Sequence, residues 1–257
     1  MTDIDPLYAL VARLRGPNGC PWDRAQTPKT VRGYLLEEAY EVASAIDDED
    51  DAALMGELGD LLFNVVTLAH MAEARGAFTL VDVMHTIQHK MVRRHPHVFG
   101  DADSADPDEV QRTWQALKAE EHPERTSALD GVPASLPALA RGQALSNKAS
   151  KVGFDWPDAT GPRQKVDEEL AELDEAMANR DPSAMDHELG DVLFSVVNLA
   201  RHLPIEGAEA SAQRVNRRFE RRFRQVESLA QAAGATLSES DEAQLEAWWA
   251  QAKVDVG

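Results

Sequence analysis

Four acidic residues in each half of the chain have the types and spacing needed for metal chemistry. They form two pairs with a spacing of three, and the same types recur 131 positions later. The two quartets are Glu38, Glu41, Glu57 and Asp60, and Glu169, Glu172, Glu188 and Asp191. Residues three apart share a helix face, so each pair would project from one side of a helix. If the two helices of a half pack as an antiparallel hairpin, its four carboxylates form one cluster.

A cluster of this kind predicts a divalent cation. Carboxylates held close together repel one another, and a hard cation is the usual neutraliser of an oxygen-only group. We therefore expect Mg²⁺, or Mn²⁺, with both quartets acting as metal ligands and catalytic residues. Zinc fits less well, because a carboxylate-rich site suits magnesium better. The histidines that would favour zinc do not recur in the second half: His85, His89, His95 and His97.

The second helix of each quartet is expected to be buried. Most of its positions are apolar, but one polar stripe runs along it: Glu57, Asp60, Asn64 and Thr67, repeated as Glu188, Asp191, Ser195 and Asn198. A helix that is apolar nearly all round is a core helix, and its ionisable groups need partners. A single Glu-x-x-Glu pair is usually a solvated helix face. The repetition and the apolar surroundings favour the metal site here.

Helical periodicity dominates the chain, which predicts the all-α class and a helix-bundle packing. A polar, unperiodic stretch separates the halves, so we expect an N-terminal domain at 1–121, a linker at 122–133 and a C-terminal domain at 134–257. The expected helices of the first domain are 5–15, 28 to the acidic turn at 47–51, from there to about 76, 79–94 and 107 onward, with 16–22 as a loop. Those of the second are about 136–151, 162–178, 182–203, 206–231 and one capped near 240. The order of elements is predicted to be the same in both domains.

Composition limits the classes of function. The chain has 257 residues, 43% of them hydrophobic, and a single cysteine, Cys20, which excludes an internal disulfide and fits a reducing compartment. No basic start precedes an apolar core, and no uninterrupted apolar run reaches the length of a membrane span, so we expect a cytoplasmic protein without membrane contact. A net charge of −19 opposes nucleic-acid binding. The exception is an arginine-rich run at 214–224, most of which we interpret as surface.

Two repeated motifs suggest contacts to an anionic substrate. A basic pair recurs as Lys90 with Arg94 and as Arg218 with Arg222, and its charges suit phosphate oxygens. A Trp-x-x-x-Lys motif recurs as Trp114 with Lys118 and as Trp249 with Lys253. These tryptophans could contact the substrate, or they could simply pack in the core, which is the commoner role of tryptophan. Trp22 and Trp156 present the same choice.

Several longer strings resemble the two-domain MazG-type nucleoside triphosphate pyrophosphohydrolases. They are Leu36-Glu37-Glu38-Ala39-Tyr40-Glu41, the run 56–63, the run 93–99 and Val152-Gly153-Phe154-Asp155-Trp156. The resemblance implies an all-α, magnesium-dependent enzyme that cuts nucleoside triphosphates into the monophosphate and pyrophosphate. It also implies a homodimer with helices paired between chains. Glu37 and Glu168, next to the first ligands, would add a further contact to metal or substrate.

Two other functions fit the same residues. One is a helical interaction or regulatory protein whose acidic metal sites are not catalytic, and the other is a phosphohydrolase that releases inorganic phosphate. Both quartets are complete, so neither copy is expected to be inactive. Arg218 stands where the first copy has Lys90, and a guanidinium can hold a phosphate at two points. We therefore expect the second copy to be the stronger catalyst.

Overall fold

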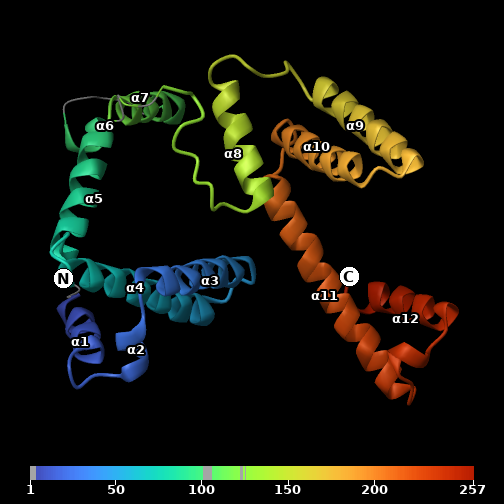
Figure 1. Ribbon diagram of the computed structural model, residues 1–257, viewed down its shortest axis with the longest axis horizontal. Coiled ribbons are helices and arrows are strands. Elements are labelled where there is room, and N and C mark those ends of the chain that lie inside the picture. The colour runs from blue at the N-terminus through green and yellow to red at the C-terminus, as the bar shows by residue number, and fades with distance from the viewer. Residues whose placement is uncertain (1–3, 101–105, 122–123, 125) are drawn as a thin grey trace. The chain divides into compact units, whose positions relative to one another are not determined.

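The computed structural model describes residues 4–100, 106–121, 124 and 126–257, apart from the side chains of 108, 115 and 119. Its secondary structure is helical, with no strand in the described residues, so the predicted all-α class is confirmed (Figure 1). The chain divides into two compact units, Met1–His122 (unit 1) and Pro123–Gly257 (unit 2). This division falls within the expected linker.

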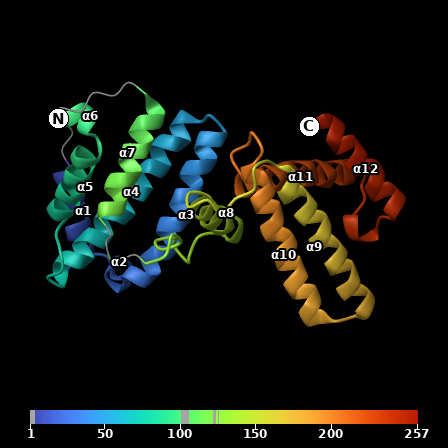
Figure 2. The same ribbon diagram turned by 90° about the horizontal axis from the view of Figure 1, so that it is seen from above.

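Unit 1 is built on a long helical hairpin. Its helices are α1 (Asp5–Arg15), α2 (Pro21–Ala25), α3 (Pro28–Asp47), α4 (Asp51–Ala74), α5 (Leu80–Arg94), α6 (Pro96–Phe99) and α7 (Pro107–Glu120). The α3 and α4 helices lie side by side in both ribbon views, and α1 packs on α4 (Figure 2). Val11, Val66, Ala69 and Leu80 form the buried core under this contact.

Unit 2 repeats the hairpin. Its helices are α8 (Ala138–Ser150), α9 (Thr160–Asn179), α10 (Pro182–Arg201), α11 (Ala208–Ala232) and α12 (Glu242–Asp255), with the 3-10 turn η1 (Leu237–Glu239). The α9 and α10 helices form the hairpin, α8 packs on α10, and α12 folds back on α11 (Figure 1). Val226, Ala230, Trp248 and Ala252 form the core between α11 and α12.

The turn of each hairpin uses the same two devices. The residue before the cap, Glu49 or Arg180, has a left-handed backbone with a φ of 54°. The next residue, Asp50 or Asp181, caps the following helix by accepting hydrogen bonds from two backbone N–H groups. These caps satisfy donors that a helix leaves unpaired at its start. The conformation of the hairpin turn is thus repeated together with the sequence.

Some expected elements differ from those found. The expected loop 16–22 ends early, because α2 begins at Pro21, and α6 forms directly after α5. Neither α2 nor α6 has a counterpart helix in the described part of unit 2, so the order of elements is not identical in the two halves. The last helix is capped by Asp241. Proline at the first helical position starts α2 and α6, since its fixed φ suits a helix and its missing N–H costs nothing there.

The α4 helix also corrects the expectation about membrane spans. By length and composition alone this helix could cross a bilayer, because it has 24 residues and its most apolar window has a mean hydropathy of 1.4. Only 22% of its most apolar window is buried within the chain. The same helix carries Glu57 and Asp60 and packs on α1 and α3. Within the chain α4 is therefore buried on one side only, and the expectation of a helix buried nearly all round is wrong for its other side. Its exposed apolar side therefore needs another explanation.

The segment that joins the two units contacts unit 2. Lys148 on α8 donates a hydrogen bond of 2.6 Å to the Asp130 carbonyl and a longer one to Ala128. The Asp130 carboxylate in turn accepts hydrogen bonds from the N–H groups of Thr126 and Ser127. The described residues of this segment form turns and no helix.

Candidate functional site

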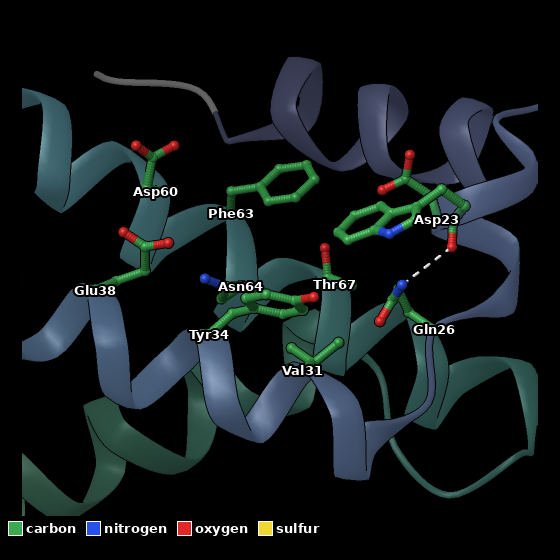
Figure 3. A pocket seen from close by; sticks show the side chains of 10 residues that line it. Asp23, Gln26, Val31, Tyr34, Glu38, Asp60, Phe63, Asn64 and Thr67 are labelled. Carbon is green, nitrogen blue, oxygen red and sulfur yellow. Dashed lines mark hydrogen bonds between the residues drawn. The ribbon is translucent and has the colours of Figure 1, made fainter.

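The α3–α4 hairpin brings three of the four unit 1 carboxylates together. Oxygens of Glu38 and Glu41 on α3 and Glu57 on α4 all lie within 4.8 Å of one another. Asp60 lies one turn further along α4, and Figure 3 shows its carboxylate beside that of Glu38. The packing of α3 against α4 is therefore what assembles this cluster.

Electrostatics within the unit 1 cluster favour a bound cation. Partial burial raises the pKa of Glu38, and repulsion from Glu41 and Asp60 raises it further. Burial likewise raises the pKa of Glu57, followed by repulsion from Glu41. Carboxylates that resist ionisation because of one another are stabilised by any divalent cation that they share.

Unit 2 forms the matching cluster from Glu169 and Glu172 on α9 and Glu188 on α10, again within 4.8 Å. Glu169 is only 4% exposed. Burial raises the pKa of Glu172, with repulsion from Glu169 and Glu188 as the next causes. Asp191 lies outside this group of three and pairs with His187 at 3.4 Å, one turn away on α10.

A lysine that sequence reasoning missed lies in the unit 2 cluster. Lys165 Nζ is 2.8 Å from Glu168 and 2.6 Å from Glu169. Hydrogen bonds to Glu168 and then Glu169 raise the pKa of this lysine, so it stays charged. Unit 1 has Tyr34 at the corresponding position, 131 residues earlier. An alignment of the two halves at the offset of 131 residues, extended four residues before Glu38 and Glu169, would have found this difference.

A pocket of about 220 Å³ adjoins the unit 1 cluster. Figure 3 shows Glu38 and Asp60 at one end and Asp23 and Gln26 at the other. The full lining is Trp22, Asp23, Gln26, Val31, Tyr34, Glu38, Asp60, Phe63, Asn64 and Thr67. Arg15 and Gln26 hold the α2 segment by donating hydrogen bonds to the Asp23 and Trp22 carbonyls, respectively.

Unit 2 has a larger and more apolar pocket, of about 350 Å³, between α8, α10 and the segment before α9. Its lining is Leu129, Leu145, Ser146, Ala149, Phe154, Trp156, Phe194, Asn198 and Arg201. Arg201 is tied to the adjoining loop, because it donates to Asp155 at 2.7 Å and to Asn198 at 2.6 Å. These hydrogen bonds with Arg201 lower the pKa of Asp155. Trp156 packs against Gly161, where a side chain would collide with the indole ring.

The expected phosphate ligands of unit 1 lie away from its cluster. Arg94 is 7% exposed and donates two hydrogen bonds to the Glu121 carboxylate. Its guanidinium also lies 4.9 Å from the centre of the Trp114 ring, and Lys118 Nζ lies 5.1 Å from it. In this structure Arg94 therefore joins α5 to α7. The α5 helix that carries Lys90 starts only after the far end of α4, roughly 25 Å beyond Glu57 at 1.5 Å per residue.

The corresponding residues of unit 2 also lie beyond the hairpin. Trp249 packs on Phe219, with ring centres 5.5 Å apart, and Lys253 Nζ lies 5.8 Å from the Trp249 ring. Arg222 donates to the Gly257 carbonyl at 3.3 Å, and Arg218 is exposed on α11. The fully packed tryptophan of α12 is its neighbour, Trp248.

Two helical hairpins, each presenting facing carboxylates, define a tandem all-α protein with two acidic metal-type clusters. The family model of the MazG nucleotide pyrophosphohydrolase domain matches the chain twice, at residues 26–99 and 162–226, which cover the two hairpins except for the first two residues of α9. The chain belongs to the MazG family, so the resemblance noted from its sequence is confirmed.

Two relatives match almost the whole chain. One is the nucleoside triphosphate pyrophosphohydrolase of Escherichia coli K12, 46% identical over 261 positions that cover 98% of each chain. The other is the nucleoside triphosphate pyrophosphohydrolase/pyrophosphatase MazG of Thermotoga maritima, 41% identical over 97% of this chain and 95% of the relative. Both names describe the class of hydrolase that the sequence predicts.

Proposed function

We propose that this protein hydrolyses nucleoside triphosphates to the monophosphate and pyrophosphate at its two carboxylate clusters, with Mg²⁺ as the cofactor. The observation that carries the proposal is the pair of three-glutamate clusters, each with oxygens within 4.8 Å, on the hairpins that match the family. Both near-complete relatives are named for this activity. The corresponding cellular role is house-cleaning of the nucleotide pool, in which the enzyme removes unwanted nucleoside triphosphates by hydrolysis.

The residues present fit a hard divalent cation. Every donor in the two clusters is a carboxylate oxygen, which is the ligand type that Mg²⁺ and Mn²⁺ prefer. When bound, such a cation would neutralise charge on the triphosphate and lower the pKa of a bound water. The raised pKa values of Glu38, Glu57 and Glu172 fit the same role, because a shared cation offsets their mutual repulsion.

The chain supplies the positioning of these groups. Glu38 and Glu41 project from α3 toward Glu57 on α4, so the hairpin fixes the distance between the two pairs of ligands. Asp60 and Asp191, one turn beyond, complete the quartets as proposed ligands. In unit 2, Lys165 places a charged ammonium at the cluster, where it can bind a phosphate oxygen as a point charge. Glu168, which also pairs with Lys165, orients that ammonium.

The remaining phosphate and base contacts are proposed for the two basic helices and their tryptophans. They comprise Lys90, Trp114, Lys118, Arg218, Arg222, Trp249 and Lys253. Arg94 is left out of this set, because it is buried and already paired with Glu121. In each unit the basic helix leaves the hairpin at the end away from the cluster, so these residues would reach a cluster most directly from a second copy of the chain. We therefore propose a homodimer in which each copy completes the sites of the other.

The exposed faces of the hairpins support this dimer. Leu62 on α4 is 42% exposed and Leu193 on α10 is 48% exposed, and Leu58 and Leu189 precede each of them by one turn on the same face. Pairing two hairpins as a four-helix bundle would bury these side chains and would account for the apolar outer side of α4. We propose no membrane or nucleic-acid partner, and a cytoplasmic location.

The test is product analysis on a mixture of nucleoside triphosphates with Mg²⁺. Monophosphate and pyrophosphate in equal amounts, lost on chelation and restored by Mg²⁺, are the expected result. Release of inorganic phosphate with the diphosphate would overturn the proposed cleavage position. No turnover in the presence of Mg²⁺ or Mn²⁺ would leave the chain as a metal-binding interaction protein.

A further inference from the structure

We infer that the pocket of unit 1 binds the nucleobase of the substrate and that Asp23 selects bases with an exocyclic amino group. The inference rests on the proposed function, because it assigns the triphosphate to the adjoining carboxylate cluster. It concerns unit 1 alone, since no carboxylate lines the unit 2 pocket.

The size and position of the pocket suit a base. Its volume of about 220 Å³ lies below the roughly 300–1,000 Å³ of pockets that enclose a whole drug-sized ligand. It reaches Glu38 and Asp60 at one end, so a base inside it would leave the phosphates at the cluster (Figure 3). The pocket and the cluster together therefore match the two ends of one nucleotide.

Aromatic side chains form the walls. Figure 3 shows Phe63 and Tyr34 on either side of the pocket, and Trp22 packs on Tyr34 with ring centres 5.8 Å apart. Trp22 is 57% exposed, which leaves most of its surface available for contact. Aromatic rings stack on any base, because every base has a π-face. The walls thus provide binding without selecting a base.

A buried hydroxyl in the pocket lacks a hydrogen-bond partner. Thr67 is 6% exposed, and its Oγ1 has no partner among the described residues. Figure 3 shows this hydroxyl directed into the space between Phe63 and Tyr34. A buried polar atom without a partner is costly, so such atoms in native proteins usually meet a ligand or water. A base edge inside the pocket would supply the partner.

Asp23 gives the pocket its selectivity. Its half-buried carboxylate has no hydrogen bond or ion pair with any described residue. An ionised carboxylate only accepts hydrogen bonds, so it pairs with an amino group, as acidic side chains do with the amine of cytosine. A carbonyl in the same place, as in uracil, would put two acceptors against each other.

Unit 2 does not offer this acceptor. Its aspartate in the loop before α9, Asp155, is occupied by Arg201 and also contacts His202 at 3.2 Å. The unit 2 pocket is lined by Arg201, Asn198, Ser146 and apolar side chains, and its lining contains no carboxylate. It does share one feature with unit 1, because the buried Ser146 hydroxyl also lacks a partner among the described residues. The two copies should therefore differ in how strongly they distinguish bases.

The test compares two ligands that differ at one position of the base. Non-hydrolysable α,β-methylene analogues of CTP and UTP are titrated calorimetrically, with Mg²⁺, into the full chain carrying Glu188→Gln and Asp191→Asn. Unit 1 should bind the CTP analogue more tightly by on the order of tenfold, since an unpaired buried polar group costs about that much. The reciprocal protein, with Glu57→Gln and Asp60→Asn, should bind the two analogues within about twofold of each other.

Single changes in the first protein identify the residues responsible. Asp23→Asn should remove the preference, because an amide both donates and accepts. Thr67→Val replaces the hydroxyl by a methyl group of similar size and should weaken the binding of both analogues equally. Asp51→Asn makes the same charge change on α4, nine residues before Asp60, and should leave the preference unchanged. Circular dichroism checks that each variant is folded.

Equal affinity for the two analogues, no binding of either, or a preference that survives Asp23→Asn would overturn the inference. Pyrophosphate release by the unmodified chain reports separately on the proposed function. Release without a base preference in unit 1 would leave that function standing, whereas absence of both release and binding would contradict both.

Discussion

Individual carboxylates in the clusters are held in an unfavourable state without metal. Burial and mutual repulsion raise the pKa values of Glu38, Glu57 and Glu172 above that of a free glutamate. The folded protein therefore binds protons at these groups more tightly than the unfolded chain does. By linkage, their contribution to stability is largest when they are protonated and is lost as the pH rises through the raised pKa values.

The pKa of Glu121 is shifted in the opposite direction, below that of a free glutamate. Hydrogen bonds from Arg94 lower its pKa to about 2. Its contribution to stability is present above the unfolded pKa, near 4.5, and is lost as the pH falls below that value. We predict that the melting temperature of the metal-free protein rises as the pH is lowered from neutral to the raised pKa values of the cluster carboxylates, and falls again below about 4.5.

Thermal melts over this pH range, with and without Mg²⁺, test the prediction. Mg²⁺ at pH 7 should raise the melting temperature, and Glu57→Gln should reduce that increase while stabilising the metal-free protein. A melting temperature that falls steadily from pH 7 downward would contradict the assigned repulsion.

Arg94 and Arg222 occupy matching positions in the repeat but are held differently. We predict that Arg94→Ala lowers the free energy of unfolding by about 2 kcal/mol, because it removes buried, charge-assisted hydrogen bonds to Glu121. Arg222→Ala should change it by less than about 0.5 kcal/mol and raise KM. Urea denaturation and steady-state kinetics give the two quantities. An unchanged stability of the Arg94 variant would assign that side chain to the substrate instead.

At the scale of the elements, the hairpin turns are specified by backbone conformation and capping. Arg180 has a left-handed φ of 54°, which costs a non-glycine residue roughly 1 kcal/mol. Asp181 accepts hydrogen bonds of 3.0 and 3.2 Å from the N–H groups of Ser183 and Ala184. Both devices hold α9 and α10 in the register that brings Glu172 to Glu188.

We predict opposite effects of two neighbouring substitutions. Arg180→Gly should stabilise the protein by up to about 1 kcal/mol, since glycine adopts the left-handed region without strain. Asp181→Ala should destabilise it by about 1 kcal/mol through loss of the cap. Asp181→Asn, which keeps a capping oxygen, is the control and should be nearly neutral. Chemical denaturation measures all three, and a stable Asp181→Ala protein would show that the cap is dispensable.

At the scale of the whole molecule, two complete clusters raise the question of which one works. We predict that Glu188→Gln with Asp191→Asn removes more activity than Glu57→Gln with Asp60→Asn. The reasons are Arg218 in place of Lys90 and the ammonium of Lys165 at the unit 2 cluster. Initial rates of pyrophosphate release for the two variants give the comparison. A larger loss from the unit 1 variant would reverse the assignment, and total loss in both would mean that the copies depend on each other.

The proposed dimer leads to a further prediction. Leu62→Glu with Leu193→Glu should convert the dimer to a monomer, because each charge would be buried in the paired hairpins. Activity should fall as well, since each copy would lose the basic residues of the other. Sedimentation equilibrium gives the mass, and Val254→Glu, on an exposed residue of α12, is the matched control. A monomeric unmodified chain would refute the dimer.

The sequence by itself determined the all-α class, the family and the helical hairpins. These follow from local causes: periodicity, Thr27 as a cap with Pro28 at the first helical position, and the repetition of Asp50 as Asp181. The spacing of three also indicated which carboxylates share a helix face. Such features can be predicted because they depend on residues that are close together in the chain.

Only the tertiary structure decided which polar groups are free and which are already paired. Nothing local distinguishes Arg94, held by Glu121 from 27 residues away, from an arginine that waits for a phosphate. The same is true of Asp155, paired with Arg201 across 46 residues, and of Asp23, which has no such partner in the described structure. These differences arise from contacts between segments far apart in sequence, and packing sets them. The unpaired Thr67 hydroxyl belongs with them, because burial depends on the packing of α2, α3 and α4 together.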